Sequence, residues 1–160
     1  MDGSDARPGP SLKARALRYL AAREHSRAEL AAKLARFVAD EDAPGAVERV
    51  LDELAAKGFI NEARVAESLL HRRAARLGNA RVLQELRAKG LPEELIRTTA
   101  GELRDTELAR AQEVWRKKFG QPPGDAAERA RQMRFLAARG FGGEVVRKVL
   151  NRAPAEDEPD

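Results

Sequence analysis

The sequence contains no cysteine among its 160 residues. This absence excludes a disulfide framework, and it excludes any zinc or iron–sulfur site that needs thiolate ligands. No apolar run approaches the roughly 20 residues that a membrane-spanning helix needs. The first ten residues also lack the apolar stretch of a signal peptide. We therefore expect a soluble, cytoplasmic protein that has no membrane partner.

Histidine and nucleotide-binding motifs are almost absent. His25 and His71 are the only histidines, and neither has a partner at a metal-ligand spacing. We expect both to lie at the surface or at its boundary. The glycines around Gly142 are not followed by the Lys-Ser/Thr pair of a phosphate-binding loop. We therefore expect no enzymatic activity, no metal site and no cofactor.

Aromatic residues make up only 4% of the chain, whereas alanine, leucine and the charged helix formers are abundant. Apolar residues recur at helical spacing in nine segments, for example at Val47, Val50, Leu51 and Leu54. No segment alternates between apolar and polar residues as a half-buried strand would. The sequence therefore predicts an all-α fold without a sheet.

Several helix starts carry side chains that can cap the free backbone amides. These are Ser26 with Glu29 as a capping box, Asn61, Asn79 and Asp125.

The single tryptophan, Trp115, shares a helical stripe with Leu108 and Ala111. We therefore expect it to pack in a core, with base stacking as the lesser alternative. In the helix that follows, the spacing predicts that Met133, Leu136 and Ala137 point inward.

An internal repeat divides the helices into groups. Residues 86–97 match residues 136–147 at an offset of 50, and residues 54–59 resemble the start of both. Each copy reads as a helix stop, with a cation before a left-handed glycine and an apolar residue after it. The repeat predicts three tandem three-helix repeats in an elongated or curved array. The expected boundaries are 1–10 for a disordered N-terminus, 11–60, 61–103 and 104–152 for the repeats, and 153–160 for an acidic disordered tail.

The net charge is +4, and it is unevenly distributed. The last seven residues carry four acids and no base, which leaves +8 on the rest of the chain. This excess of positive charge favours an anionic partner, either nucleic acid or an acidic protein surface. A solvated surface of mixed charge with a modest positive bias is the equally weighted alternative.

Basic residues cluster between residues 64 and 97, where eight lysines and arginines face four acids. Part of this excess complements the negative end of a helix. We predict that the rest forms a partner-binding surface made of Arg72, Arg73, Arg76, Arg81, Arg87 and Lys89. A secondary basic face is predicted at Arg116, Lys117, Lys118, Arg129, Arg131 and Arg134.

The order and spacing of three segments resemble the RecX family of regulatory proteins. The segments are residues 16–30 (ALRYLAAREHSRAEL), 50–62 (VLDELAAKGFINE) and 84–91 (QELRAKGL). Each alone is a generic capping box or helix stop, but their succession is far more specific. The chain departs from the family pattern at Asn61, which is usually acidic, and at Val65, which is usually aromatic.

The resemblance implies a regulator that binds along the filament of RecA on DNA. We expect a monomer, and whether it also contacts the single-stranded DNA within the filament stays open. The resemblance also implies inhibition of RecA ATP hydrolysis, strand exchange and coprotease activity, and thus a role in homologous recombination, DNA repair and the SOS response. A freestanding helical protein that binds nucleic acid directly is the alternative.

Overall fold

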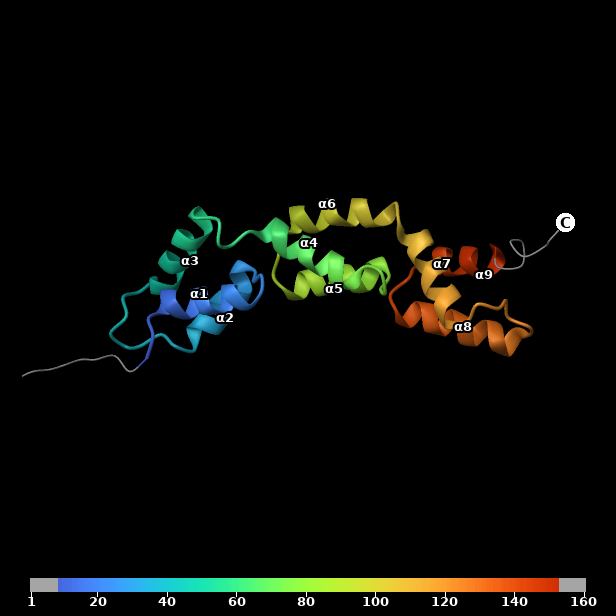
Figure 1. Cartoon of the computed structure of the whole chain (residues 1–160), viewed down its shortest axis with the longest axis horizontal. Coiled ribbons are helices and arrows are strands. Elements are labelled where there is room, and N and C mark those ends of the chain that lie inside the picture. The colour runs from blue at the N-terminus through green and yellow to red at the C-terminus, as the bar shows by residue number, and fades with distance from the viewer. Residues whose placement is uncertain (1–8, 153–160) are drawn as a thin grey trace, which may run out of the picture. The chain divides into compact units, whose positions relative to one another are not determined.

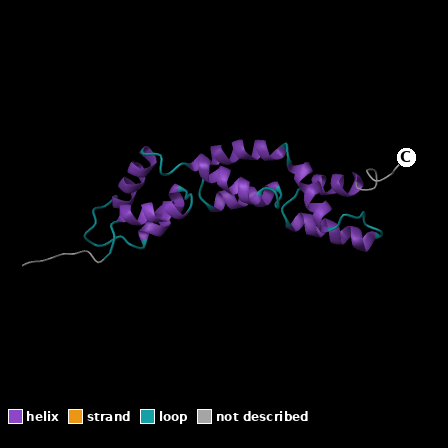
Figure 2. Ribbon diagram, viewed as in Figure 1, coloured by secondary structure: helices purple, strands orange, loops and turns teal. Residues whose placement is uncertain are grey.

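The computed structural model describes residues 9–152, and within that range it contains nine α-helices and no strand (Figures 1 and 2). The all-α prediction is confirmed. The helices are α1 (Leu12–Ala22), α2 (Arg27–Ala35), α3 (Ala46–Ala56), α4 (Glu62–Arg73), α5 (Asn79–Ala88), α6 (Glu93–Arg104), α7 (Glu107–Lys118), α8 (Ala126–Ala138) and α9 (Gly143–Arg152). The segments expected to be disordered lie outside the described residues, apart from residues 9 and 10.

The nine helices of residues 9–152 are joined by loops. They form two compact units. One holds residues 9–65 with Lys89–Leu91, and the other holds Ala66–Ala88 with residues 92–152. The repeat boundaries at 11–60, 61–103 and 104–152 stay a prediction.

The first unit is built on α1, α2 and α3, which all contact one another. Its core is a leucine cluster in which Leu30, Leu34 and Leu54 are completely buried. These residues sit at helical spacing, so one face of each helix is apolar and turns inward. Burial of such side chains stabilises the unit by about 1.5–3 kcal/mol each.

A hydrogen-bonded cluster around Glu29 fixes the start of α2. The Ser26 hydroxyl accepts from the Glu29 amide at 3.0 Å, and the Glu29 carboxylate accepts from the Ser26 amide at 3.0 Å. The predicted capping box is therefore confirmed. Arg23 pairs with Glu29 at 2.8 Å and Lys89 pairs with it at 3.5 Å. Burial alone would raise the pKa of Glu29, but the bonds from Arg23 and Ser26 and the charge of Lys89 lower it to about 2.

The second unit contains two packed groups. Helices α5 and α6 lie side by side, while α7, α8 and α9 surround a core that includes Ala111, Leu136 and Phe141 (Figure 1). Trp115 packs against this core and donates its indole N–H to Gln132 Oε1 at 2.8 Å. The prediction that Trp115 is a packing residue is confirmed.

Arg110 of α7 joins the two groups of the second unit. Its guanidinium donates to the carbonyls of Ala74 at 2.9 Å, Leu77 at 2.6 Å and Leu103 at 3.2 Å, and to the Asn79 side chain. Burial lowers the pKa of Arg110, and neighbouring Glu107 opposes that effect. One side chain thus holds the loop before α5 against the start of α7.

The same loop is joined to the end of α8 by its backbone. The Gly78 amide donates to the Arg139 carbonyl at 2.7 Å, and the Ala80 amide donates to the Gly140 carbonyl at 3.2 Å. A Cβ on Gly78 would stand 2.2 Å from the Gly140 backbone carbon and the Phe141 nitrogen. Only a residue without a side chain allows so close a backbone approach.

Helix ends follow the sequence predictions, with one exception. Asn61 and Asp125 accept from the amides three residues ahead, at 3.0 and 2.8 Å. The predicted cap at Asn79 is wrong, because Asn79 lies inside α5 and its side chain accepts from Arg110 instead. Gly58, Gly90 and Gly140 all have φ between 72° and 94°, which confirms the three predicted helix stops.

We expect Gly78→Ala to destabilise the second unit by about 1–3 kcal/mol, because the added methyl group must push two backbone segments apart. Chemical unfolding followed by Trp115 fluorescence reports on this unit. Gly101→Ala is the matched control, since Gly101 lies within α6 and its added Cβ meets nothing within 4 Å. The control should gain about 0.5–1 kcal/mol. Equal stability of Gly78→Ala and the wild type would refute the close approach.

Glu29 should make stability fall in acid. Its carboxyl has a pKa of about 2 when folded and 4.5 as the reference value, so its ion pairs stabilise the fold above pH 4.5. That stabilisation is lost as pH falls from about 4.5 towards 2. Glu29→Gln should lower the free energy of unfolding by about 1–3 kcal/mol at neutral pH. It should also flatten the acid limb in denaturation followed by circular dichroism. Exposed Glu48→Gln is the control, and a steep acid limb retained in Glu29→Gln would contradict the assignment.

Candidate polyanion-binding groove

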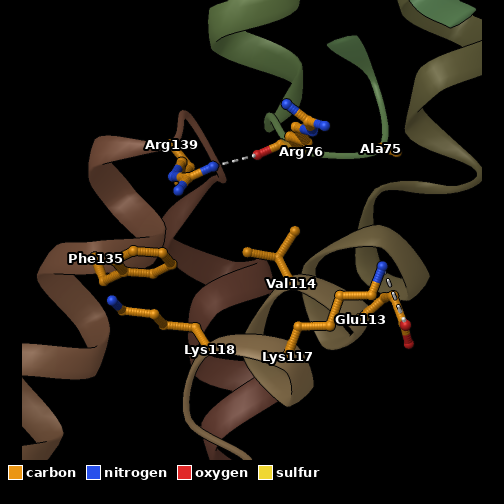
Figure 3. A pocket seen from close by; sticks show the side chains of 8 residues that line it. All are labelled: Ala75, Arg76, Glu113, Val114, Lys117, Lys118, Phe135 and Arg139. Carbon is orange, nitrogen blue, oxygen red and sulfur yellow. Dashed lines mark hydrogen bonds and ion pairs between the residues drawn. The ribbon is translucent and has the colours of Figure 1, made fainter. Parts of the chain in front are cut away.

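A groove of about 680 Å³ opens on the second unit between α7, the end of α8 and the loop after α4. We call it the cationic groove, because four of its eight lining residues are lysine or arginine. The lining residues are Ala75, Arg76, Glu113, Val114, Lys117, Lys118, Phe135 and Arg139. Figure 3 shows Arg76 and Arg139 on one side, Lys117 and Lys118 on the other, and Val114 between them.

Most of the positive charge in the groove has no carboxylate partner. The only acid of the lining, Glu113, accepts from Arg116 at 2.6 and 3.1 Å and lies 3.7 Å from Lys117. The hydrogen bond from Arg116, the largest influence, lowers the pKa of Glu113, so the carboxylate stays ionised and occupied. Within residues 9–152, Arg76, Lys118 and Arg139 make no ion pair. As far as residues 9–152 are concerned, the groove therefore has cations without an acidic partner on both sides.

An aromatic pair borders the groove and holds cations on its rings. Phe135 and Phe119 meet edge to face with ring centroids 5.3 Å apart. The Lys118 ammonium lies 5.4 Å from the Phe135 ring centre, and the Arg139 guanidinium lies 4.9 Å from it. Such contacts attract a cation to the ring and restrain its side chain. Phe135 thus positions two of the groove's charges.

Helix ends place the cations at the groove. Lys117 and Lys118 occupy the last turn of α7, and Arg139 is the C-cap of α8. Cations are favoured at these positions because the carbonyl end of a helix is negative. The Arg139 side chain also donates to the Arg76 carbonyl at 3.4 Å, which ties it to the loop after α4 (Figure 3).

The structure separates the residues of the first predicted surface. Arg76 lines the cationic groove, and exposed Arg72 stands nearby in the chain on α4. Arg73 makes a forked pair with Glu85 at 2.8 and 3.3 Å, which neutralises it. Arg81 donates to the Ala138 carbonyl at 3.3 Å and lies against Gly140. Arg81 therefore supports the end of α8.

The two other members of that set have partners as well. Arg87 faces Glu93 at 3.4 Å, and both side chains are more than half exposed. Lys89 belongs to the first unit, where its ammonium pairs with Glu29 and its carbonyl accepts from the Ser26 hydroxyl at 2.5 Å. Its side chain is only 20% exposed. Lys89 thus has a clear structural role.

The second predicted face is partly joined to the first. Lys117 and Lys118 share the cationic groove with Arg76, although the sequence assigned them to separate sets. Arg116 pairs with Glu113, Arg131 lies 3.4 Å from Glu128, and Arg129 donates to Asn151 at 3.0 Å. Arg134 is exposed on α8.

Two sequence expectations about burial are wrong. His25 is only 1% exposed. Its burial is tolerated because both ring nitrogens have partners: Nδ1 bonds to the Arg23 carbonyl at 3.0 Å, and Nε2 bonds to the Lys33 ammonium at 2.7 Å. Met133 and Ala137, which were expected inside, are exposed, whereas Gln132 is buried. The Gln132 amide bonds to Trp115, Gln121 and Glu128, so a satisfied polar side chain takes the inward position.

Sequence reasoning missed Arg139 and Phe135 as site residues. The sequence does single out Arg139, because the helix-stop repeat places a cation before each glycine. That pattern predicts a role in ending the helix and does not predict a role in binding. In the described part of the chain, no three histidine or acidic side chains gather as metal ligands. No helix between residues 9 and 152 is long and apolar enough to cross a membrane.

Comparison with known proteins relates the whole described chain to one family. Family models for the first, second and third three-helix domains of RecX match residues 13–54, 61–99 and 105–150. The regulatory protein RecX of Leptothrix cholodnii is 56% identical over 154 residues, which is 96% of each chain. That of Herminiimonas arsenicoxydans is 50% identical and covers 92% of this chain and 95% of its own.

Solved structures agree on the fold. The crystal structure of RecX from Lactobacillus salivarius superimposes with a TM-score of 0.71 at 17% identity, covering 90% of this chain and 95% of that one. A second regulatory protein RecX gives a TM-score of 0.70 over 88% of this chain and 71% of its own. The three domain matches, in chain order, together with identity above one half to a curated relative, show that this chain belongs to the RecX family of regulatory proteins.

Proposed function

We propose that this protein binds the RecA–single-stranded DNA filament and restrains RecA ATP hydrolysis, strand exchange and coprotease activity. Family membership along nearly the full chain carries the proposal, because it applies to all three domains at once. A regulator needs a binding surface and no reaction centre. The cationic groove supplies a surface of that kind, since a filament that carries nucleic acid is strongly anionic.

The repeats themselves support a filament as partner. Each three-helix repeat can meet an equivalent surface on one protomer of a helical polymer. Linked contacts of this kind add as avidity, so weak single contacts give useful overall affinity.

A freestanding nucleic-acid-binding protein is the second candidate. Arg76, Lys118 and Arg139, which form no ion pair with any described residue, favour it, because phosphate contacts need no protein partner. The two functions differ in a simple assay. Under the first, a substoichiometric amount of protein slows ATP hydrolysis by RecA on single-stranded DNA. Unchanged hydrolysis together with strong binding to free DNA would establish the second.

We expect charge reversal on the predicted partner-binding surface to remove most of the inhibition of RecA ATP hydrolysis. The variant is Arg72→Glu with Arg76→Glu. Arg73 is left in place because it pairs with Glu85. Both changed side chains are exposed, so the variant should fold with a stability change of about 1 kcal/mol or less. The measurement is the concentration of protein that halves the RecA hydrolysis rate, which should rise at least about tenfold.

The matched control is Arg97→Glu with Arg104→Glu, which makes the same charge change at exposed positions of α6. It should inhibit nearly as well as the wild type. Full inhibition by the Arg72 and Arg76 variant would place the functional surface elsewhere, and Arg129, Arg131 and Arg134 on α8 would be the next residues to reverse.

A further inference from the structure

We infer that the cationic groove is a single-stranded nucleic-acid site, in which Lys118 and Arg139 hold successive phosphates across a floor formed by Val114. This inference deepens the proposed function, because it assigns a ligand to a groove of the same protein. It can nevertheless fail on its own, because it is tested without RecA.

The arrangement of charge favours a chain of phosphates. Cations stand on both sides of the groove, and only one acid, already bonded to Arg116, lines it. A single strand carries one charge per nucleotide and can pair with both sides as it crosses. Arginine matches phosphate oxygens with its fork, and lysine meets them as a point charge.

The aromatic border also favours a phosphate ligand, through the cations that it holds. Here the Phe135 ring has Lys118 and Arg139 close to it, so its first role is to restrain these cations. Phosphates then meet side chains that have already lost much of their rotational freedom, which lowers the entropic cost of binding.

The groove is poorly suited to an acidic peptide, the other polyanion to consider. A peptide gains most of its affinity by burying an apolar or aromatic anchor in a closed pocket. The aliphatic lining consists of Val114 and Ala75, and the one ring of the lining already contacts two cations. Nucleic acid needs no such anchor, because release of its counterions supplies the affinity.

The groove is held in shape before any ligand arrives. The Arg139 backbone accepts from Gly78 at 2.7 Å, and Arg110 holds the preceding loop to α7. Both sides are therefore parts of one hydrogen-bonded assembly within the second unit. Changes confined to the side chains of Lys118 and Arg139 leave these backbone bonds intact.

The test is binding of a fluorescent oligothymidine to the full chain in the absence of RecA, over a series of salt concentrations. We expect Lys118→Gln with Arg139→Gln to weaken binding at low salt by about tenfold or more, because two charge-assisted contacts are lost. The slope of log affinity against log salt should fall in magnitude by about 0.7 for each cation removed. Trp115 fluorescence and thermal unfolding check that the variant is folded.

Arg97→Gln with Arg104→Gln is the matched control, because it removes the same charge from exposed positions outside the groove. It should keep the wild-type slope within about 0.7. An equal loss in both variants would mean that binding follows net charge, and it would overturn the groove. A second outcome would also overturn the inference. If an oligoglutamate of matched charge binds the wild type as tightly as oligothymidine does, and loses the same affinity in the groove variant, the ligand is an acidic protein.

RecA hydrolysis assays with the same variants separate this inference from the proposed function. A wild-type protein that inhibits RecA but does not bind oligothymidine would leave the proposed function standing and refute the groove's ligand. A protein that binds oligothymidine through the groove but leaves RecA hydrolysis unchanged would support the groove and refute the filament function.

Discussion

The second unit depends on the Arg110 guanidinium, which reaches from the first turn of α7 to carbonyls of the loop between α4 and α5 and of the last turn of α6. Three backbone oxygens and the Asn79 side chain converge on this group. Loop carbonyls that lose water need such a partner, since each one left unpaired costs about 1–3 kcal/mol. A neutral side chain at residue 110 could satisfy only part of the set. The partly buried Arg110 guanidinium and these four oxygens therefore stabilise one another.

The cationic groove follows from this junction. With the loop after α4 fixed on α7, the Gly78 amide reaches the Arg139 carbonyl, and the end of α8 comes to rest beside Arg76. The groove is the space left between the junction and the last turn of α7. Its shape is therefore set by backbone hydrogen bonds, while its charge is set by the side chains of Arg76, Lys117 and Lys118, which are exposed, and of Arg139, which is half-buried. Shape and charge can be altered separately, which is why side-chain variants are informative about binding.

Helix ends were predictable because their chemistry is local. A capping box or a cation–glycine stop is complete within six residues, so Ser26, Asp125 and Gly140 behave as their patterns indicate. The junction was not predictable, since the bonds of Arg110 reach back 31 to 36 residues to partners that carry no motif. The same reason explains Gln132, whose burial depends on Trp115 in another helix. For the groove, the sequence indicated local positive charge at Arg76 and at Lys117 and Lys118, but their convergence arises only from packing.

The position of the cations also limits how strongly the groove can bind. Lys117, Lys118 and Arg139 stand at the carbonyl ends of α7 and α8, where the helix dipoles carry about half a negative charge each. Part of their positive charge therefore stabilises the helices and is less available to a ligand. The groove should consequently attract an anion less strongly than its formal charge indicates. Weak, salt-dependent contacts of this kind suit a protein of tandem repeats, in which affinity accumulates over several sites rather than residing in one.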